Sequence, residues 1–141
     1  SKNPGTKTHV RGVNMDAENA RLYTPDEKVK RIKRELTRLR KSFKPLPEDK
    51  RRLAEGLMQE VAFMRVTLEE TREIIDREGV IELFEQGKQR FLREHPATKV
   101  YASLVNRYSA VVKQLVDLLP DPKQGQDVTD ELMEFVKKQA R

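Results

Sequence analysis

The sequence predicts a mainly α-helical protein, and three observations support this fold class. Charged residues make up 37% of the 141 residues and hydrophobic residues 36%, with no tryptophan and no cysteine. That composition is typical of helical bundles and coiled coils rather than of compact enzymes. Apolar residues recur at spacings of three and four over long stretches, which is the period of an amphipathic helix. Proline and glycine separate these stretches, as expected at helix ends.

The start of the chain, residues 1–23, is expected to form a disordered basic arm. The stretch SKNPGTKTHVRGVN mixes glycine, proline, asparagine and lysine without apolar periodicity. Such a segment buries too little apolar surface to offset its conformational entropy. We therefore expect no stable structure before the first helix.

An amphipathic helix is expected over residues 24–45. Thr24 is a good N-cap residue, Pro25 suits the first helical position, and Glu27 stands three residues after the cap. Together they predict a capping box. The prolines of Pro45-Leu46-Pro47 should end the helix. Its apolar seam consists of Val29, Ile32, Leu36, Leu39 and Phe43.

The middle of the chain, residues 46–120, is expected to form a core of two long helices. The first should run from about residue 48 to residue 77 and stop at Gly79. The second should begin at His95-Pro96 and end at Pro120. The two apolar stripes comprise Leu53, Leu57, Val61, Met64, Leu68 and Ile75, widened by Ala54, Met58, Phe63 and Ile74, and then Tyr101, Leu104, Tyr108, Val111, Val112, Leu115 and Leu119.

The segment between these two helices, residues 80–94, has no unique interpretation from its pattern. Ile81, Phe84 and Phe91 roughly keep the helical period, whereas Gln86-Gly87 could be the turn of a hairpin. Gln-Gly is a weaker hairpin signal than Asn-Gly. Periodicity alone therefore leaves helix and hairpin open.

The end of the chain, residues 121–141, is expected to form a flexible linker and a short amphipathic helix. Pro120-Asp121-Pro122 ends the preceding helix and begins a polar stretch that reaches Asp127. The final helix of about a dozen residues would be marginal in isolation, so we expect it to become ordered on a protein partner. The residues expected to contact that partner are Leu132, Met133, Phe135 and Val136.

Positive charge is concentrated at the front of the chain. The net charge is +6, and residues 1–47 carry 13 Lys and Arg against 5 Asp and Glu, which gives +8 and leaves −2 for the remainder. A basic segment on a nearly neutral body is typical of proteins that bind nucleic acid. No aromatic residues interleave with the charges of the first helix, so contacts to phosphates are favoured over base stacking. The candidate DNA-binding residues are Lys28, Lys30, Arg31, Lys33, Arg34, Arg38, Arg40, Lys41 and Lys44.

The sequence offers no catalytic or metal-binding motif. It has no glycine-rich phosphate loop, no HExxH and no serine elbow. The absence of cysteine excludes disulfides and thiolate metal sites. His9 lies in the expected arm, and His95 precedes a helix-starting proline, where capping is the simpler role. We therefore expect no enzymatic activity, no cofactor and no metal.

The hydropathy of the chain predicts neither a membrane span nor a large core. Mean hydropathy is −0.79, and no apolar run approaches the roughly 20 residues that a span needs. Three amphipathic helices of this composition bury little surface within one subunit, so contact between copies would complete the core. A monomeric three-helix bundle is the alternative. The residues expected at contacts between copies are Leu57, Val61, Met64, Leu68, Tyr101, Leu104, Tyr108, Val112 and Leu115.

Several local features between residues 27 and 120 occur in a recognisable order. They are the helical run AFMRVTLEE, the segment led by Gly79 that contains Gln86-Gly87, the helix start Glu94-His95-Pro96-Ala97, Tyr101, and the run from Lys113-Gln114-Leu115 to Leu118-Leu119-Pro120. None of them is a catalytic fingerprint. In this order they resemble the small terminase subunits of tailed bacteriophages.

This resemblance implies a fold, a function and partners. Small terminase subunits form rings, recognise viral DNA when packaging begins, and regulate the ATPase and nuclease of the large terminase subunit without a catalytic centre of their own. The implied fold is an antiparallel helical hairpin core with a small β-hairpin at about residues 80–93. The implied assembly is a homo-oligomeric ring, with a nonamer as the best single estimate.

The implied partners are double-stranded viral DNA and the large terminase subunit, and the implied location is the host cytoplasm during virus assembly. The chain lacks the clear N-terminal helix-turn-helix of some members of the family. The basic helix and the preceding arm would therefore contact DNA instead.

Two other functions fit parts of the sequence. The chain could be a helical adaptor or coiled-coil scaffold for a protein with an acidic surface, its basic residues serving solubility. It could also be an enzyme with a scattered carboxylate site, although solvated helix faces explain acidic pairs such as Glu69-Glu70 more simply.

Overall fold

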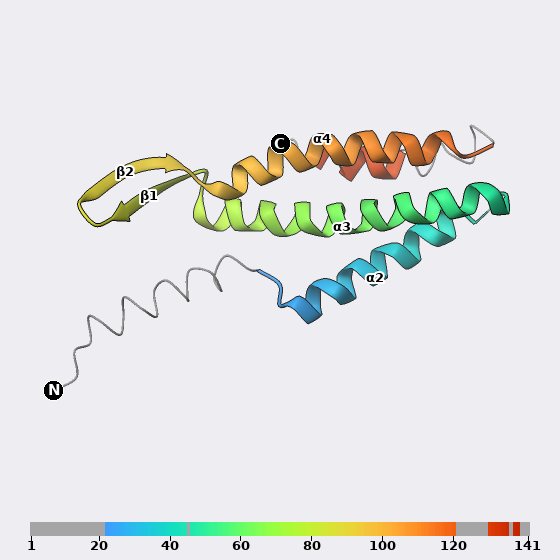
Figure 1. Ribbon diagram of the computed structural model, residues 1–141, viewed down its shortest axis with the longest axis horizontal. Coiled ribbons are helices and arrows are strands. Elements are labelled where there is room, and N and C mark those ends of the chain that lie inside the picture. Colours follow the sequence, from blue (N-terminus) through green and yellow to red (C-terminus); the bar gives the residue numbers. More distant parts are fainter. Residues whose placement is uncertain (1–21, 45, 121–129, 136, 139–141) are drawn as a thin grey trace.

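The computed structural model describes residues 22–44, 46–120, 130–135 and 137–138. Its elements follow the order α2 (Pro25–Ser42), α3 (Glu48–Glu78), β1 (Ile81–Gln86), β2 (Gln89–Glu94) and α4 (Pro96–Asp117). Helix α3 lies between α2 and α4, and the two strands extend beyond one end of the helices (Figure 1). The fold is therefore mainly helical with one small antiparallel sheet, as predicted.

The helix ends follow local chemistry that the sequence reveals. Thr24 caps α2 with the predicted capping box: its side chain accepts a hydrogen bond from the Glu27 amide, and the Glu27 side chain accepts one from the Thr24 amide. Gly79 ends α3 with a φ of 86°, a left-handed conformation that costs glycine little. Helix α4 ends at Asp117, earlier than expected. There the Leu118 and Leu119 amides bond to the carbonyls three residues back, which tightens the last turn.

The segment that pattern alone left open forms a β-hairpin. Strands β1 and β2 pair antiparallel, with Phe84 opposite Phe91 and Leu83 opposite Leu92. The turn between them includes Gly87, whose φ of 58° suits glycine in a tight hairpin turn. The hairpin expected from the family resemblance is therefore confirmed.

The core lies where α3 meets α2 and α4. Helices α3 and α4 run antiparallel along most of their length, so their apolar stripes face each other (Figure 1). Burial of such side chains contributes about 1.5–3 kcal/mol each. The buried cluster comprises Leu39, Phe43, Leu46, Ala54, Met58, Val61, Ala62, Met64, Leu68, Tyr108, Val112, Leu115, Leu132 and Phe135.

Most of the residues expected at contacts between copies belong to this core instead. Their side chains are at most 3% exposed because α3 and α4 pack against each other within one subunit. Leu57, Tyr101 and Leu104 are only partly buried, at the margin of the cluster. The structure thus reassigns six of the nine residues to the subunit's own core: Val61, Met64, Leu68, Tyr108, Val112 and Leu115.

Three residues of the predicted apolar stripes are exposed. Val29 is 49% exposed, since α2 diverges from α3 toward its N-terminus (Figure 1). On α3, Leu53 is 59% and Phe63 46% exposed. The apolar faces of these helices are therefore wider than the surface that one subunit covers.

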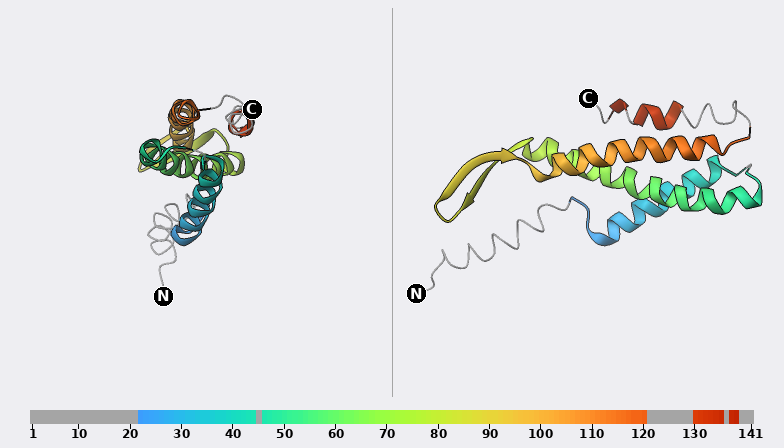
Figure 2. Two further views of the ribbon diagram at one scale, coloured as in Figure 1. Left: turned by 90° about the vertical axis from the view of Figure 1, so that its right-hand side faces the viewer. Right: turned by 45° about the horizontal axis from the view of Figure 1, so that its top comes forward.

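The C-terminal segment, residues 130–135 and 137–138, is helical and packs on the same core. Leu132 is fully buried, and the Phe135 ring lies 5.3 Å from the Tyr108 ring. The Arg72 guanidinium donates a hydrogen bond to the Lys138 carbonyl. Figure 2 shows the segment beside α4. Two of the residues expected to bind a partner are thus covered within the subunit.

The other two residues of that set differ. Met133 is 42% exposed, and the Val136 side chain lies outside the described residues. Residues 1–21 and 121–129 also lie outside them. Tyr23, which we assigned to the disordered arm, is buried, and its amide donates a hydrogen bond to Glu70 Oε2 at 3.0 Å. Of the helices that the structure describes, none is long and apolar enough to cross a membrane.

Truncating Leu132 tests whether the C-terminal segment packs on the core in solution. The Leu132→Ala variant should lower the free energy of unfolding by about 2–5 kcal/mol, because it leaves a cavity in the core where Leu132 is buried. Met133→Ala, one residue along and exposed, is the matched control and should change it by about 0.5 kcal/mol or less. Equal small effects in urea unfolding would show that the segment is not docked.

Candidate nucleic-acid interface

The orientation of α2 divides its cations into two groups. Successive residues of a helix are about 100° apart. The buried residues Leu39 and Phe43 therefore define one face. Lys30, Lys33, Arg34 and Lys41 fall within an arc of about 100° on the opposite side. Lys44, just beyond the helix end, continues this line. We call these five residues the basic stripe.

The cations of the basic stripe are available to a ligand. All five residues are exposed. Within the described parts of the chain, none of their side chains has an ion pair or a hydrogen bond. Five uncompensated positive charges along one face give the strong local potential that attracts a polyanion.

Four cations of the predicted DNA-binding set lie outside the basic stripe. Two of them, Lys28 and Arg31, make contacts that hold the N-terminal end of α2 in place. Lys28 Nζ lies 3.2 Å from Glu70 Oε1 and 5.2 Å from the centre of the Phe63 ring. The Arg31 guanidinium stacks 4.0 Å from the Tyr23 ring centre. Glu70 also accepts a hydrogen bond from the Tyr23 amide, so this carboxylate connects the start of α2 to α3.

The other two, Arg38 and Arg40, form ion pairs with acidic residues. Arg38 binds Glu35 one turn before it, and its Nη1 lies 3.1 Å from Glu131 Oε2 of the C-terminal segment. Arg40 Nε donates to Glu55 Oε1 of α3 at 3.0 Å. The hydrogen bond from Arg40 is the main reason that the pKa of Glu55 is lowered. These arginines position α2 more than they offer charge to a ligand.

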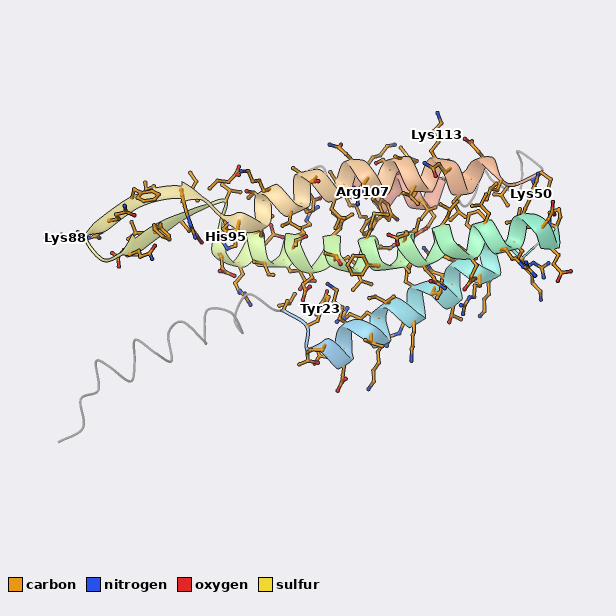
Figure 3. All side chains as sticks on the ribbon, in the orientation of Figure 1. Tyr23, Lys50, Lys88, His95, Arg107 and Lys113 are labelled. Carbon is orange, nitrogen blue, oxygen red and sulfur yellow. The ribbon has the colours of Figure 1, made fainter. Side chains whose placement is uncertain are left out.

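More basic residues flank the stripe where α2 meets α3. A groove of about 380 Å³ lies between the two helices there, and the Arg51 guanidinium donates to the Leu46 carbonyl at 3.0 Å. Lys50 projects from this end of α3 (Figure 3). The sequence prediction assigned the run Lys50-Arg51-Arg52 to the helical core. Its charge, next to a helix end, was the signal that could have placed it here. The residues lining the groove are Thr37, Arg40, Lys41, Phe43, Lys44, Arg51, Glu55 and Met58.

His95 has a structural role at the opposite end of the helices. Its Nδ1 accepts a hydrogen bond from the Ala97 amide at 3.0 Å and so caps α4. Its Nε2 lies 3.3 Å from Glu78 Oε1. The pKa of Glu78 is lowered chiefly by its hydrogen bond from Arg77 and also by the one from His95. Among the described residues, no group of three or more acidic or histidine side chains is arranged to hold a metal ion. His9 lies outside them.

Comparisons with protein-family models, curated proteins and solved structures find no match to this chain. The structural evidence for its function therefore comes from the charges and contacts of the described residues. The feature that they single out is the basic stripe, fixed in orientation by Glu35, Glu55 and Glu70 on its inner side.

Removing the Glu70 carboxylate tests how the start of α2 is held. In Glu70→Ala the buried Tyr23 amide loses its acceptor, so the free energy of unfolding should fall by about 1–3 kcal/mol. Amide exchange at Tyr23 should accelerate accordingly. The control is Glu73→Ala, since Glu73 is exposed and, within the described residues, accepts a hydrogen bond from the Tyr23 hydroxyl at 3.5 Å rather than from its amide. If both variants exchange Tyr23 at the wild-type rate, Glu70 does not anchor α2.

Proposed function

We propose that this chain is a ring-forming, non-catalytic DNA-binding subunit that acts like a small terminase subunit: it recognises viral DNA and regulates the large terminase ATPase and nuclease. The observation that carries the DNA-binding part is the basic stripe. Its cations are exposed on one face, while the other cations of α2 are paired inside the subunit. Five cations without an ion pair in the described structure, gathered on one exposed face, attract a polyanion.

The size of the stripe suits double-stranded DNA. From Lys30 to Lys41 the stripe spans about 16 Å at the helical rise of 1.5 Å per residue. The major groove of B-DNA is about 12 Å wide. Helix α2 laid across or along the groove would therefore bring lysines to phosphates on both sides. Lys50 and Arg52, exposed near the start of α3, add positive charge close to the Lys44 end of the stripe.

The contacts expected from such a surface are mainly electrostatic. Lysine and arginine bind phosphate oxygens whatever the base sequence, and each phosphate neutralised contributes about 0.9 to the slope of log K against log salt. Among the described residues, no exposed aromatic side chain stands on the stripe to stack on bases. Sequence recognition would then require additional contacts or the repetition of this surface around a ring.

The assembly and motor parts of the proposal rest on the resemblance in residues 27–120 and on the apolar surface left exposed. Leu53, Phe63 and the β-hairpin present apolar side chains that one subunit does not cover. For the large subunit, we propose the C-terminal segment as the contact. Met133 is exposed already, whereas Leu132 and Phe135 would become available only on undocking.

Charge reversal on the stripe tests the DNA-binding proposal. The triple variant Lys33→Glu, Arg34→Glu, Lys41→Glu should abolish measurable binding at physiological salt. At low salt it should reduce the slope of log K against log salt by about 3, because three fewer phosphates are neutralised. Fluorescence anisotropy with a labelled duplex across a salt titration measures both quantities.

A triple reversal on α4 is the matched control. Lys99→Glu, Arg107→Glu, Lys113→Glu makes the same change in net charge, and α4 lies across α3 from α2 (Figure 3). It should keep most of the affinity and the salt slope. Equal reductions in the two variants would mean that net charge alone attracts DNA. If the wild-type chain bound an acidic protein tightly and did not bind DNA, the adaptor function would be favoured instead.

Freeing a paired cation beside the stripe should strengthen binding. In Glu55→Gln, Arg40 loses its carboxylate partner and can reach a phosphate, so the salt slope should rise by about 1. Glu60→Gln makes the same charge change on α3, at an exposed residue without an ion pair in the described structure. If the two variants gain equally, Arg40 takes no part in DNA binding.

A further inference from the structure

The β-hairpin exposes apolar side chains on both of its faces. Leu83 and Leu92, which pair across the strands, are 48% and 71% exposed, and Ile81 on the same face is 60% exposed. On the other face Phe91 is 48% exposed beside Phe84. A two-stranded hairpin is marginally stable in water unless a face is covered. This one projects away from the helices of its own subunit (Figure 1).

The two strands carry opposite charge. Strand β1 contains Glu82 and Glu85 and no basic residue, whereas β2 contains Arg90 and Arg93 against Glu94. Within the hairpin the opposite residues pair, with 2.7 Å from Arg93 Nη2 to Glu82 Oε2. The outer edge of β1 is thus bordered by acidic side chains and the outer edge of β2 by basic ones.

The edge of β1 borders a large open groove at the base of the hairpin. The groove has a volume of about 1070 Å³ and is lined by four consecutive β1 residues, Glu82 to Glu85, and by the ends of α3 and α4. Its walls also carry Glu70 and Glu78, which pair with Lys28 and Arg77, and the cations Arg77 and Arg93. The carboxylates that an incoming strand with basic side chains would meet are therefore those of β1 itself, Glu82 and Glu85.

We propose that the hairpin is the head-to-tail contact between copies of this chain: β2 of one copy pairs with the edge of β1 of the next. Arg90 and Arg93 of the incoming strand then face Glu82 and Glu85, and the exposed leucines of neighbouring hairpins meet. The inference rests on the self-assembly in the proposed function and names its contact surface.

Charge decides between this contact and a symmetric one. Two β1 edges, or two β2 edges, would place like charges side by side, which disfavours pairing. Pairing β2 with β1 of the next copy joins opposite charges and keeps the sheet antiparallel throughout, provided that all hairpins point the same way. A contact between two different surfaces repeats from copy to copy and closes into a ring when the rotation permits.

A charge-swapped hairpin provides the test. The variant Glu82→Arg, Glu85→Arg, Arg90→Glu, Arg93→Glu keeps the net charge and both cross-strand pairs. Alone, it should assemble like the wild type. Co-expressed with wild-type chain under a different affinity tag, it should be excluded, because each mixed contact joins like charges. We expect mixed assemblies about tenfold below the statistical proportion, a typical effect of two opposed charge pairs.

A second variant tests the apolar contact. Leu83→Asn with Leu92→Asn should reduce the mass from light scattering to that of a monomer. Val29→Asn on α2, where the side chain is 49% exposed, is the control and should keep the assembly. Circular dichroism should show unchanged helix content in all variants. The hairpin contact would be wrong if the double leucine variant still assembled. It would also be wrong if the charge-swapped chain mixed with the wild type in the statistical proportion or above it. Either result would leave DNA binding, and assembly through another surface, unaffected. A monomeric wild type would refute assembly itself.

Discussion

The ion pair between Glu35 and Arg65 is the interaction on which the arrangement of α2 depends. Glu35 Oε1 lies 3.3 Å from Arg65 Nη1, and both side chains are largely buried. Arg65 also reaches Glu131 of the C-terminal segment at 3.1 Å. Without Glu35, Arg65 would keep only the more exposed carboxylates of Glu69 and Glu131, whose ion pairs are weaker. The pair fixes the rotation of α2 about its axis, and Lys30 of the basic stripe lies about 140° away from Glu35.

Features that depend on neighbours in sequence could be predicted, whereas ion pairs between residues far apart in the sequence could not. The capping box at Thr24, the stop at Gly79 and the start at Pro96 depend on neighbours in sequence, and the structure has them where expected. The sorting of the cations does not. Lys28 is paired because Glu70, 42 residues away, lies beside it after folding. A charge run in the sequence therefore locates a basic helix but cannot separate its structural cations from its free ones.

The apolar face of the C-terminal segment is another feature whose contacts the sequence could not predict. Its amphipathic pattern predicts a helix with one apolar face but not whether its own subunit or a partner covers that face. Here Leu132 is buried in the core, and the Phe135 ring lies against the Tyr108 ring. The buried Tyr108 hydroxyl has no hydrogen-bond partner in the described structure, and burial raises its pKa. An unpaired hydroxyl costs about 1–3 kcal/mol, which offsets part of the apolar gain and leaves the segment modestly held.

The proposed roles of the stripe and the hairpin depend on each other, because weak phosphate contacts give tight binding only when several copies are joined. One stripe has five free cations, and at physiological salt a few phosphate contacts give only the weak, sequence-independent binding of a single basic surface. When copies are joined, each further contact on the same DNA is intramolecular, so avidity exceeds single-site affinity by about 10²–10⁴-fold. Helix α2, which carries the stripe, lies alongside α3, whereas the hairpin extends beyond the end of the helices (Figure 1). In the proposed assembly, contacts through the hairpins would leave the outer face of α2 uncovered, and a ring built this way would present the stripes to DNA in a regular array.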